Sequence, residues 1–318
     1  VEKANNLLAA LIDNDIQKPG GGLGIDPRTV EWKRVMDMND RALRQIVTGM
    51  GSGNHPLRET GFDITVASEV MAILCLADDV ADLQARLARI RIGKDTAGNP
   101  VTAGDVGAAG AMAALLVEAM QPNMVQSIHG SAALVHGGPF ANIAHGCNSV
   151  IATRAALALG EFAVTEAGFG ADLGAEKFCH IKCRSAGLAP AAAVVVATVR
   201  ALKYHGGMAL ADLGRADAAA LDRGLAVLAR HVENLQGLGL PVVVAINAFA
   251  GDTAEEHAQV LHHCRDGLNV AAHLCTHWAD GPAGAEALAR SVAALADANS
   301  DPHAHFAPLY EDGTDVEV

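Results

Sequence analysis

The sequence predicts an α/β protein with an open, mostly parallel sheet that is flanked by helices and carries a helical insertion. Three short apolar runs rich in valine and alanine predict buried parallel strands, at residues 162–165, 191–196 and 242–246. Segments of helical spacing lie between or after them, at residues 221–235, 254–268 and 285–296. This alternation is typical of right-handed strand–helix–strand crossovers, and a hydrophobic content of 51% supports a large packed core.

The first half of the chain is expected to be mainly helical. Apolar spacing predicts helices over residues 4–14, 65–76 and 103–120. The first of these is expected to end at the run Lys18-Pro19-Gly20-Gly21-Gly22. Because a helix with an apolar face needs a neighbour to cover it, we expect a further piece of protein upstream of residue 1.

Composition narrows the classes of partner. A net charge of −13 argues against nucleic acid and anionic membranes as partners, although a local pocket for small anions remains compatible with it. The sequence has no apolar run of about eighteen residues and no signal-like start, so the expected location is the cytoplasm. Six scattered cysteines favour reduced, buried thiols over disulfides.

Ligands of open α/β sheets bind at the carboxyl ends of the strands, so residues that follow the predicted strands are the first candidates. Phe169, between two glycines, either caps the core or offers a flat ring to a planar ligand. Asp252 or Thr253 is the expected helix N-cap, with a ligand contact as the alternative for Asp252, and Asn247 offers a donor and an acceptor suited to a purine edge. Trp278, beside a glycine-containing turn, is either a core residue or part of a binding surface.

One cluster of metal-binding side chains does not predict a metal site. His273, Cys275 and His277 alternate along the chain, with Cys264 upstream. Their spacing does not match that of paired zinc ligands, and core or surface positions explain them better.

A phosphate-binding loop is also absent from the sequence. Gly93-Lys94-Asp95-Thr96 is similar to the end of such a loop, but Ala88 stands where its first glycine is required, and we expect a turn there. The pattern G-x-x-x-x-G-K-[ST] occurs nowhere in the 318 residues. The residues by themselves therefore predict a water-soluble α/β ligand-binding protein and no particular reaction.

Four longer segments carry a resemblance to a known family. They are GFDITVASE at residues 61–69, HGGPFANIAHGCNS at 136–149, TEAGFGADLGAEKF at 165–178 and VATVRALKYHGG at 196–207. The last is similar to a signature of the formate–tetrahydrofolate ligases. Together the four segments make essentially the whole chain resemble that family.

The resemblance implies a P-loop NTPase-like fold and a cytoplasmic homotetramer active in one-carbon metabolism. It implies that formate attacks the terminal phosphate of ATP to give formyl phosphate, and that the N10 amine of tetrahydrofolate then takes the formyl group. The implied small-molecule partners are formate, tetrahydrofolate and ATP, with Mg²⁺ and a monovalent cation, K⁺ or NH4⁺, as cofactor and activator. Residues 1–150 would continue a nucleotide-binding domain, and residues 151–318 would form an α/β part that binds folate and nucleotide.

The resemblance also assigns residues to the folate site. By position, Phe169 and Trp278 are similar to the rings that sandwich the pterin, and Phe249 would line the same pocket. The family usually has a proline after this phenylalanine, whereas this chain has Ala250, which would loosen the wall of the folate site.

Further positions are implied for the nucleotide and the reacting centre. Asn247 and Asp252 stand where the family reads the nucleotide base, and Asn142 and His145 are candidates for the reacting centre. His180 replaces a residue that is commonly acidic or an amide in the family.

The largest departure is the missing phosphate loop, which the family carries upstream of the region that matches residue 1, while its last domain follows the region that matches residue 318. We therefore expect this chain to be an incomplete and inactive piece of a ligase, because the developing phosphoryl charge would lack its cradle. Two alternatives stay open. The chain is a relative that binds folate or nucleotide without catalysis, or it is one half of a split ligase.

Overall fold

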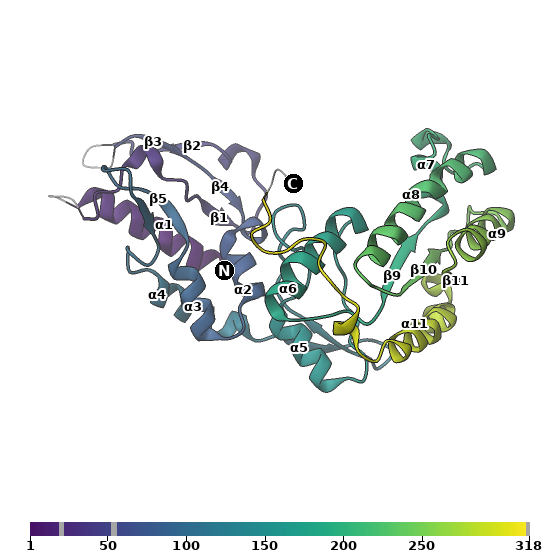
Figure 1. The fold of residues 1–318 in the computed structure, drawn as a ribbon. Helices are drawn as coiled ribbons and strands as arrows, with labels where there is room; N and C mark the ends of the chain where they lie inside the picture. The colour runs from purple at the N-terminus through teal and green to yellow at the C-terminus, as the bar shows by residue number, and fades with distance from the viewer. Residues whose placement is uncertain (19–21, 52–55, 316–318) are drawn as a thin grey trace. The chain divides into compact units, whose positions relative to one another are not determined.

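The computed structural model describes residues 1–18, 22–51 and 56–315 and has the mixed α/β character that the sequence predicts (Figure 1). The chain divides into two compact units, Val1–Phe169 and Gly170–Val318. Helix α5 (Val150–Leu159) belongs to the first unit, and the predicted division between residues 150 and 151 stays a prediction. Of the predicted helix break after Lys18, residues 19–21 lie outside the described residues.

The first unit is built around helices. Its predicted helices are confirmed with changed ends. Ser68 caps α2, and its hydroxyl accepts a hydrogen bond from Met71 N–H, so residues 65–67 form a separate short turn. Apolar residues of these helices form one core around Leu8, Leu83 and Met112. The helices are α1 (Glu2–Gln17), α2 (Glu69–Leu76), α3 (Val80–Ala88) and α4 (Ala109–Leu116), together with α5.

Short strands in the first unit were missed by the sequence prediction. β1 (Arg34–Met36) pairs in parallel with β4 (Phe62–Ile64). Strands of three or four residues carry too few side chains to show a period, which is why the pattern did not reveal them. The antiparallel pairs are β2 (Ile46–Thr48) with β3 (Arg58–Thr60), β5 (Arg91–Lys94) with β6 (Pro100–Thr102), and β7 (Asn123–Gln126) with β8 (Ala132–Val135).

The turn predicted at Gly93-Lys94-Asp95-Thr96 is wrong for its first half. Gly93 and Lys94 lie in β5, and the turn begins at Asp95, whose carboxylate accepts hydrogen bonds from the N–H groups of Ala97 and Asn99. A β-carbon on Gly93 would come within 2.8 Å of the Thr29 carbonyl oxygen. This glycine therefore serves the close approach of two backbone segments.

The predicted strand at residues 162–165 is also wrong. These residues form no strand, and Val164 is 88% exposed. A strand needs the N–H and C=O groups of a neighbour, and no strand in the described part of the chain pairs with this segment.

The second unit contains a three-stranded parallel sheet in the order β11-β10-β9 (Figure 1). β9 (Ala193–Ala197) and β10 (Val242–Asn247) confirm two predicted strands, and β11 (Ala271–Cys275) was not predicted. Val244 in the central strand lies opposite Val195 and Ala272. The single large sheet that was expected is replaced, in the described residues, by this sheet and four two-stranded ones.

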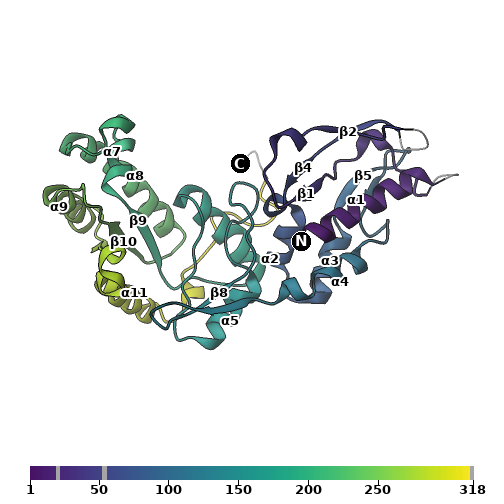
Figure 2. The same ribbon diagram turned by 180° about the vertical axis from the view of Figure 1, so that it is seen from behind.

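Helices cover this sheet from both sides (Figure 2). Long helix α8 (Ala218–Gly237) presents Leu221, Leu225 and Leu228 to the face that carries Val195 and Val244, and α9 (Ala254–His262) packs on the same face. α11 (Glu286–Ala298) lies on the other face. The remaining helices are α6 (Arg184–Ala186), α7 (Val199–His205) and α10 (His277–Asp280).

In the first unit, one carboxylate ties helix α1 to two different sheets. Asp13 accepts a hydrogen bond from Arg34 on β1 at 2.7 Å and another from Arg58 on β3. Burial alone would raise the pKa of Asp13, but the hydrogen bonds from the two arginines outweigh it and hold the pKa below its ordinary value. The Asp13 carboxylate is therefore charged in the folded protein at neutral pH.

We predict that Asp13→Asn lowers the free energy of unfolding at pH 7 by about 3 kcal/mol, because two arginines lose their shared anion. Since the folded pKa is depressed, the stabilisation is complete above the unfolded value of about 3.9 and is lost as pH falls through the lower folded value. Urea unfolding of parent and variant from pH 7 to pH 2 should show the difference shrinking at the acid end.

The control for this prediction is Asp63→Asn. Asp63 pairs with Lys33 at 3.5 Å, and both side chains are about half exposed, so its loss should cost less than about 1 kcal/mol. Equal losses at the two positions, or an Asp13 effect that does not change with pH, would contradict the assignment.

Candidate functional site

The carboxyl edge of the three-stranded sheet gathers most of the predicted site residues. β10 ends at Asn247, which lies opposite Cys275 at the end of β11. The next N–H along, that of Ala248, donates to the Cys275 carbonyl oxygen at 3.0 Å, so the two loops leave the sheet side by side. The loop after β10 carries Phe249, and the loop after β11 carries Trp278 in α10.

Both aromatic rings are open to solvent. Phe249 is 50% exposed and Trp278 is 95% exposed, although large aromatic side chains usually bury most of their surface. The turn that holds Trp278 is itself fixed, because Thr276 N–H donates to the Gly284 carbonyl oxygen at 3.0 Å. A β-carbon on Gly284 would come within 2.5 Å of His277 N, so only glycine fits this approach.

Asp252 is turned inward. Its side chain is 2% exposed, and Oδ2 accepts a hydrogen bond from Phe249 N–H at 2.9 Å and lies 3.2 Å from His257 Nε2. The N-cap of α9 is the next residue, Thr253, whose hydroxyl accepts from Glu256 N–H at 3.2 Å. Of the two positions that the sequence left open for the N-cap, Thr253 is the one used.

A buried ion pair lies behind this edge of the sheet. Lys203 Nζ donates to Glu256 Oε1 at 2.9 Å and to the Arg215 carbonyl oxygen at 2.8 Å. The same carboxylate accepts from Thr253 N–H at 3.0 Å, which completes a capping box. The Lys203 and Glu256 side chains are 1% and 3% exposed, so this network links α7 to the start of α9 inside the protein.

Sequence reasoning overlooked this network, although it left a signal. Thr253-x-x-Glu256 is a capping-box pattern, and Lys203 lies inside the segment that resembles the family signature. The pairing itself could not be inferred, because the two charged residues are 53 positions apart. Burial of the ammonium and carboxylate groups likewise appears only in the folded chain.

The first unit holds the other predicted residues, on two loops that pack together. Phe169 adopts φ 54°, a left-handed backbone that only glycine, asparagine and aspartate adopt readily. A β-carbon on the preceding Gly168 would come within 2.5 Å of the Gly146 carbonyl oxygen. The Phe169 turn therefore rests on the loop that carries Asn142, which is exposed, and His145, which is fully buried.

Strain of this kind is often kept for a function. Phe169 is 74% exposed, so the strained turn holds a large ring in solvent. The structure thus brings Asn142, His145 and Phe169 into one region of the first unit, and Asn247, Phe249, Asp252 and Trp278 into one region of the second.

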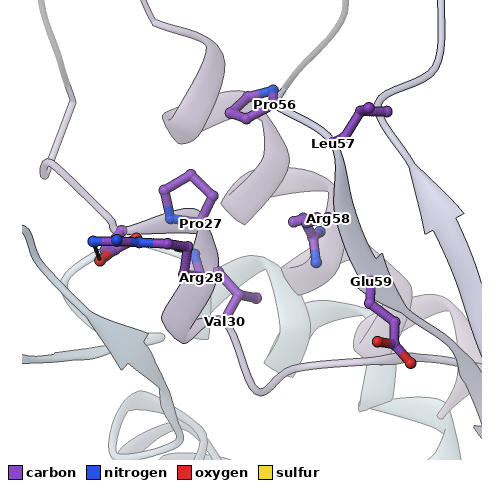
Figure 3. Close-up of a pocket in the computed structure, with 8 residues that line it drawn as sticks. Pro27, Arg28, Val30, Pro56, Leu57, Arg58 and Glu59 are labelled. Atoms are coloured by element: carbon purple, nitrogen blue, oxygen red, sulfur yellow. Dashed lines mark hydrogen bonds and ion pairs between the residues drawn. The ribbon is translucent and has the colours of Figure 1, made fainter.

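A hollow in the first unit lies elsewhere. It measures about 500 Å³, and Figure 3 shows Pro27 and Arg28 on one side of it and Leu57, Arg58 and Glu59 on the other. None of the predicted site residues lines it. Arg28 is already paired with Asp26 at 2.8 Å, and Arg58 is paired with Asp13. Both arginines that line the hollow therefore have carboxylate partners within the protein. We base the candidate site on the sheet edge and not on this hollow.

The described residues contain no cluster of metal-ligating side chains. Within residues 1–18, 22–51 and 56–315, no three histidine, cysteine or acidic side chains gather as metal ligands would. Mg²⁺ beside a nucleotide is usually held by one or two carboxylates together with phosphates and water, so we assign no residue of this chain to the implied Mg²⁺ and derive no chemical step through it.

The cysteines do not provide a nucleophile. All six are buried. Burial, assisted by Glu176, raises the pKa of the Cys179 thiol to about 12, and burial raises that of Cys264 to about 11. Both thiols stay neutral at physiological pH and are unreactive. In the part of the chain that the structure describes, no helix has the length and apolar character needed to cross a membrane.

The chain is therefore an α/β protein with exposed aromatic and amide side chains at the carboxyl edge of a parallel sheet, the place where open α/β folds generally bind ligands. Comparison with known proteins makes this specific. The family model for formate–tetrahydrofolate ligase matches residues 1–318, and the chain belongs to this family.

Individual relatives agree with this family membership. The chain is 64% identical over 313 residues to the formate–tetrahydrofolate ligase of Paracoccus denitrificans (strain Pd 1222), covering 98% of this chain and 55% of that protein. It is 60% identical over 307 residues to the ligase of Methylobacterium sp. (strain 4-46), covering 96% of this chain and 55% of the other. The chain thus spans about half the length of the curated relatives it matches.

We predict that Lys203→Met destabilises the second unit by about 3–5 kcal/mol, because it leaves the Glu256 carboxylate buried without its cation. The double variant Lys203→Met/Glu256→Gln should recover part of this loss, since a neutral amide keeps the capping box and removes the stranded charge. Denaturant unfolding followed by circular dichroism measures both. A double variant that is no more stable than Lys203→Met alone would contradict this account of the pair.

Proposed function

We propose that this chain supplies the tetrahydrofolate-binding part of an ATP-dependent ligase that joins formate to tetrahydrofolate. The observation that carries the proposal is the pair of solvent-exposed rings, Phe249 and Trp278, on loops that follow neighbouring parallel strands. A pterin is a flat, polar bicycle, and an aromatic surface binds it by stacking while its edges keep their hydrogen bonds. Family membership supports the same ligand.

We propose roles in the same ligase reaction for the other predicted site residues. Phe169 supplies a further ring from its strained turn, and Asn247 at the end of β10 reads the nucleotide base through its amide. Asn142 and His145 contribute to the reacting centre. The three-stranded parallel sheet is part of a P-loop NTPase-like sheet, and the full ligase is a homotetramer activated by a monovalent cation.

The proposed reaction has two steps. Attack of a formate oxygen on the terminal phosphorus of ATP releases ADP and gives formyl phosphate, a mixed anhydride whose carbonyl carbon is open to nucleophiles. The N10 amine of tetrahydrofolate then attacks that carbon, phosphate leaves, and 10-formyltetrahydrofolate forms. Stacking of the pterin on Phe249 and Trp278 would hold the amine in place for this attack.

We predict that tetrahydrofolate quenches the fluorescence of Trp278. The chain has two tryptophans, and Trp32 lies in the core of the first unit with Nε1–H donating to the Asn5 carbonyl oxygen at 3.1 Å. Quenching should therefore survive Trp32→Phe and disappear in Trp278→Phe. Calorimetry should show that Trp278→Ala weakens binding by tenfold or more, in line with the loss of one stacking ring. Quenching that follows Trp32 instead would contradict the proposed site.

We also predict that the purified 318-residue chain does not form 10-formyltetrahydrofolate from formate, ATP and tetrahydrofolate with Mg²⁺ and K⁺ present. Its sequence has no phosphate-binding loop, so no cradle of backbone amides and lysine would stabilise the transferring phosphoryl group. The Paracoccus denitrificans ligase is the positive control. Turnover by the chain would show that another of its segments binds the phosphates.

A further inference from the structure

We infer that Asp252 is a positioning residue for Phe249 and does not read the nucleotide base itself. This inference rests on the proposed folate function and deepens it. It concerns the turn of residues 249–252 between β10 and α9, where family resemblance implies a nucleotide contact for the Asp252 carboxylate. The geometry of the turn points to a different task.

Asp252 holds both backbone polar groups of Phe249. Its own N–H donates to the Phe249 carbonyl oxygen at 3.0 Å, and its Oδ2 accepts from Phe249 N–H at 2.9 Å. One residue therefore closes the turn in both directions and fixes φ and ψ at Phe249. Because half of the Phe249 surface is open to solvent, packing restricts the ring only in part, and the fixed backbone helps to set its direction.

The Asp252 carboxylate is itself anchored from the helix that follows. His257, one turn into α9, places Nε2 at 3.2 Å from Oδ2, and its side chain is largely buried. The start of that helix is fixed in turn by the capping box of Thr253 and Glu256 and by the buried ammonium of Lys203. One set of hydrogen bonds thus fixes the start of α9, and a second set, from His257 through Asp252, holds the backbone of Phe249.

These contacts leave the carboxylate poorly suited to a nucleotide. The Asp252 side chain is 2% exposed, and its Oδ2 already accepts a backbone hydrogen bond. To meet a base, it would have to leave both Phe249 N–H and His257, and the turn of residues 249–252 would lose two of its contacts. Its contribution to ligand binding is therefore made through the ring of Phe249.

The test is a double-mutant cycle on tetrahydrofolate affinity, measured by calorimetry with Asp252→Ala, Phe249→Ala and the double variant. We expect Asp252→Ala to weaken binding about tenfold, the size of one lost hydrogen bond to a charged group. The double variant should bind no more weakly than Phe249→Ala alone, because the ring that Asp252 positions is already gone. Asp252→Asn, which keeps an oxygen acceptor for Phe249 N–H, should recover most of the affinity.

Two controls separate positioning from general effects. Glu255→Ala removes an equal charge from the exposed first turn of α9 and should change neither affinity nor thermal stability. ATP affinity should be the same in the parent and in Asp252→Ala. Additive losses in the cycle, or weakened ATP binding with unchanged tetrahydrofolate binding, overturn the inference.

A ligand-free measurement distinguishes this inference from the proposed function. Hydrogen exchange at the Phe249 amide, followed by nuclear magnetic resonance, should speed up at least tenfold in Asp252→Ala and stay close to the parent rate in Asp252→Asn. A parent chain that shows this pattern but does not bind tetrahydrofolate overturns the proposed function and leaves Asp252 as the residue that fixes the turn. An unchanged exchange rate in Asp252→Ala overturns the positioning role, whatever the ligand.

Discussion

The ion pair between Lys203 and Glu256 is the interaction on which the candidate site depends. Removing an ammonium and a carboxylate from water is costly, and a buried pair is tolerated when its remaining hydrogen-bonding groups are also satisfied. Here Lys203 also donates to the Arg215 carbonyl oxygen, and Glu256 accepts from Thr253 N–H. The pair joins α7, the residues leading into α8, and the start of α9. The ion pair thereby fixes the position of α7 relative to the start of α9, which follows the loop after β10.

The sheet with its covering helices and the loops of the candidate site are stabilised by different interactions. The sheet and its helices are held together by apolar packing. Leucines of α8 pack on valines of β9 and β10, and burial of this apolar surface supplies most of the stability of the second unit. The site is held by hydrogen bonds in short turns and by glycines at positions where a side chain would collide with backbone, such as Gly168 and Gly284. This division allows Phe249, Trp278 and Phe169 to stay exposed, since the rings are not required for the packing of the core. Their exposure is a cost in water that a flat ligand would remove.

Much of the second unit could be predicted from sequence, and particular residues show where prediction ended. β9 and β10 were found because their valine runs are continuous, whereas β11 reads Ala-Ala-His-Leu-Cys and gives no such run. Residues 162–165 have the same composition as a buried strand, but strand formation depends on a neighbour that sequence pattern does not reveal. Similarly, the sequence located Phe249 and Asp252 on a loop after a strand, yet it could not show that the carboxylate turns inward toward His257. An aspartate in such a loop is compatible with an N-cap, a ligand contact or a turn, and only the folded contacts of Asp252 distinguish them.

By itself the sequence determined the family, the charge balance, the absence of a phosphate-loop pattern and the places where loops follow the strands β9 and β10. Those properties are local or additive, because a motif, a net charge and a run of apolar residues can each be read directly from the sequence without knowing the fold. Only the tertiary structure decided which charged groups are buried together, which rings are exposed and which carboxylate supports a ring. Those properties depend on residues far apart in sequence, as Lys203 and Glu256 are, and on whether folding leaves water beside a side chain. The residue type at one position determines neither its distant partner nor its exposure to water.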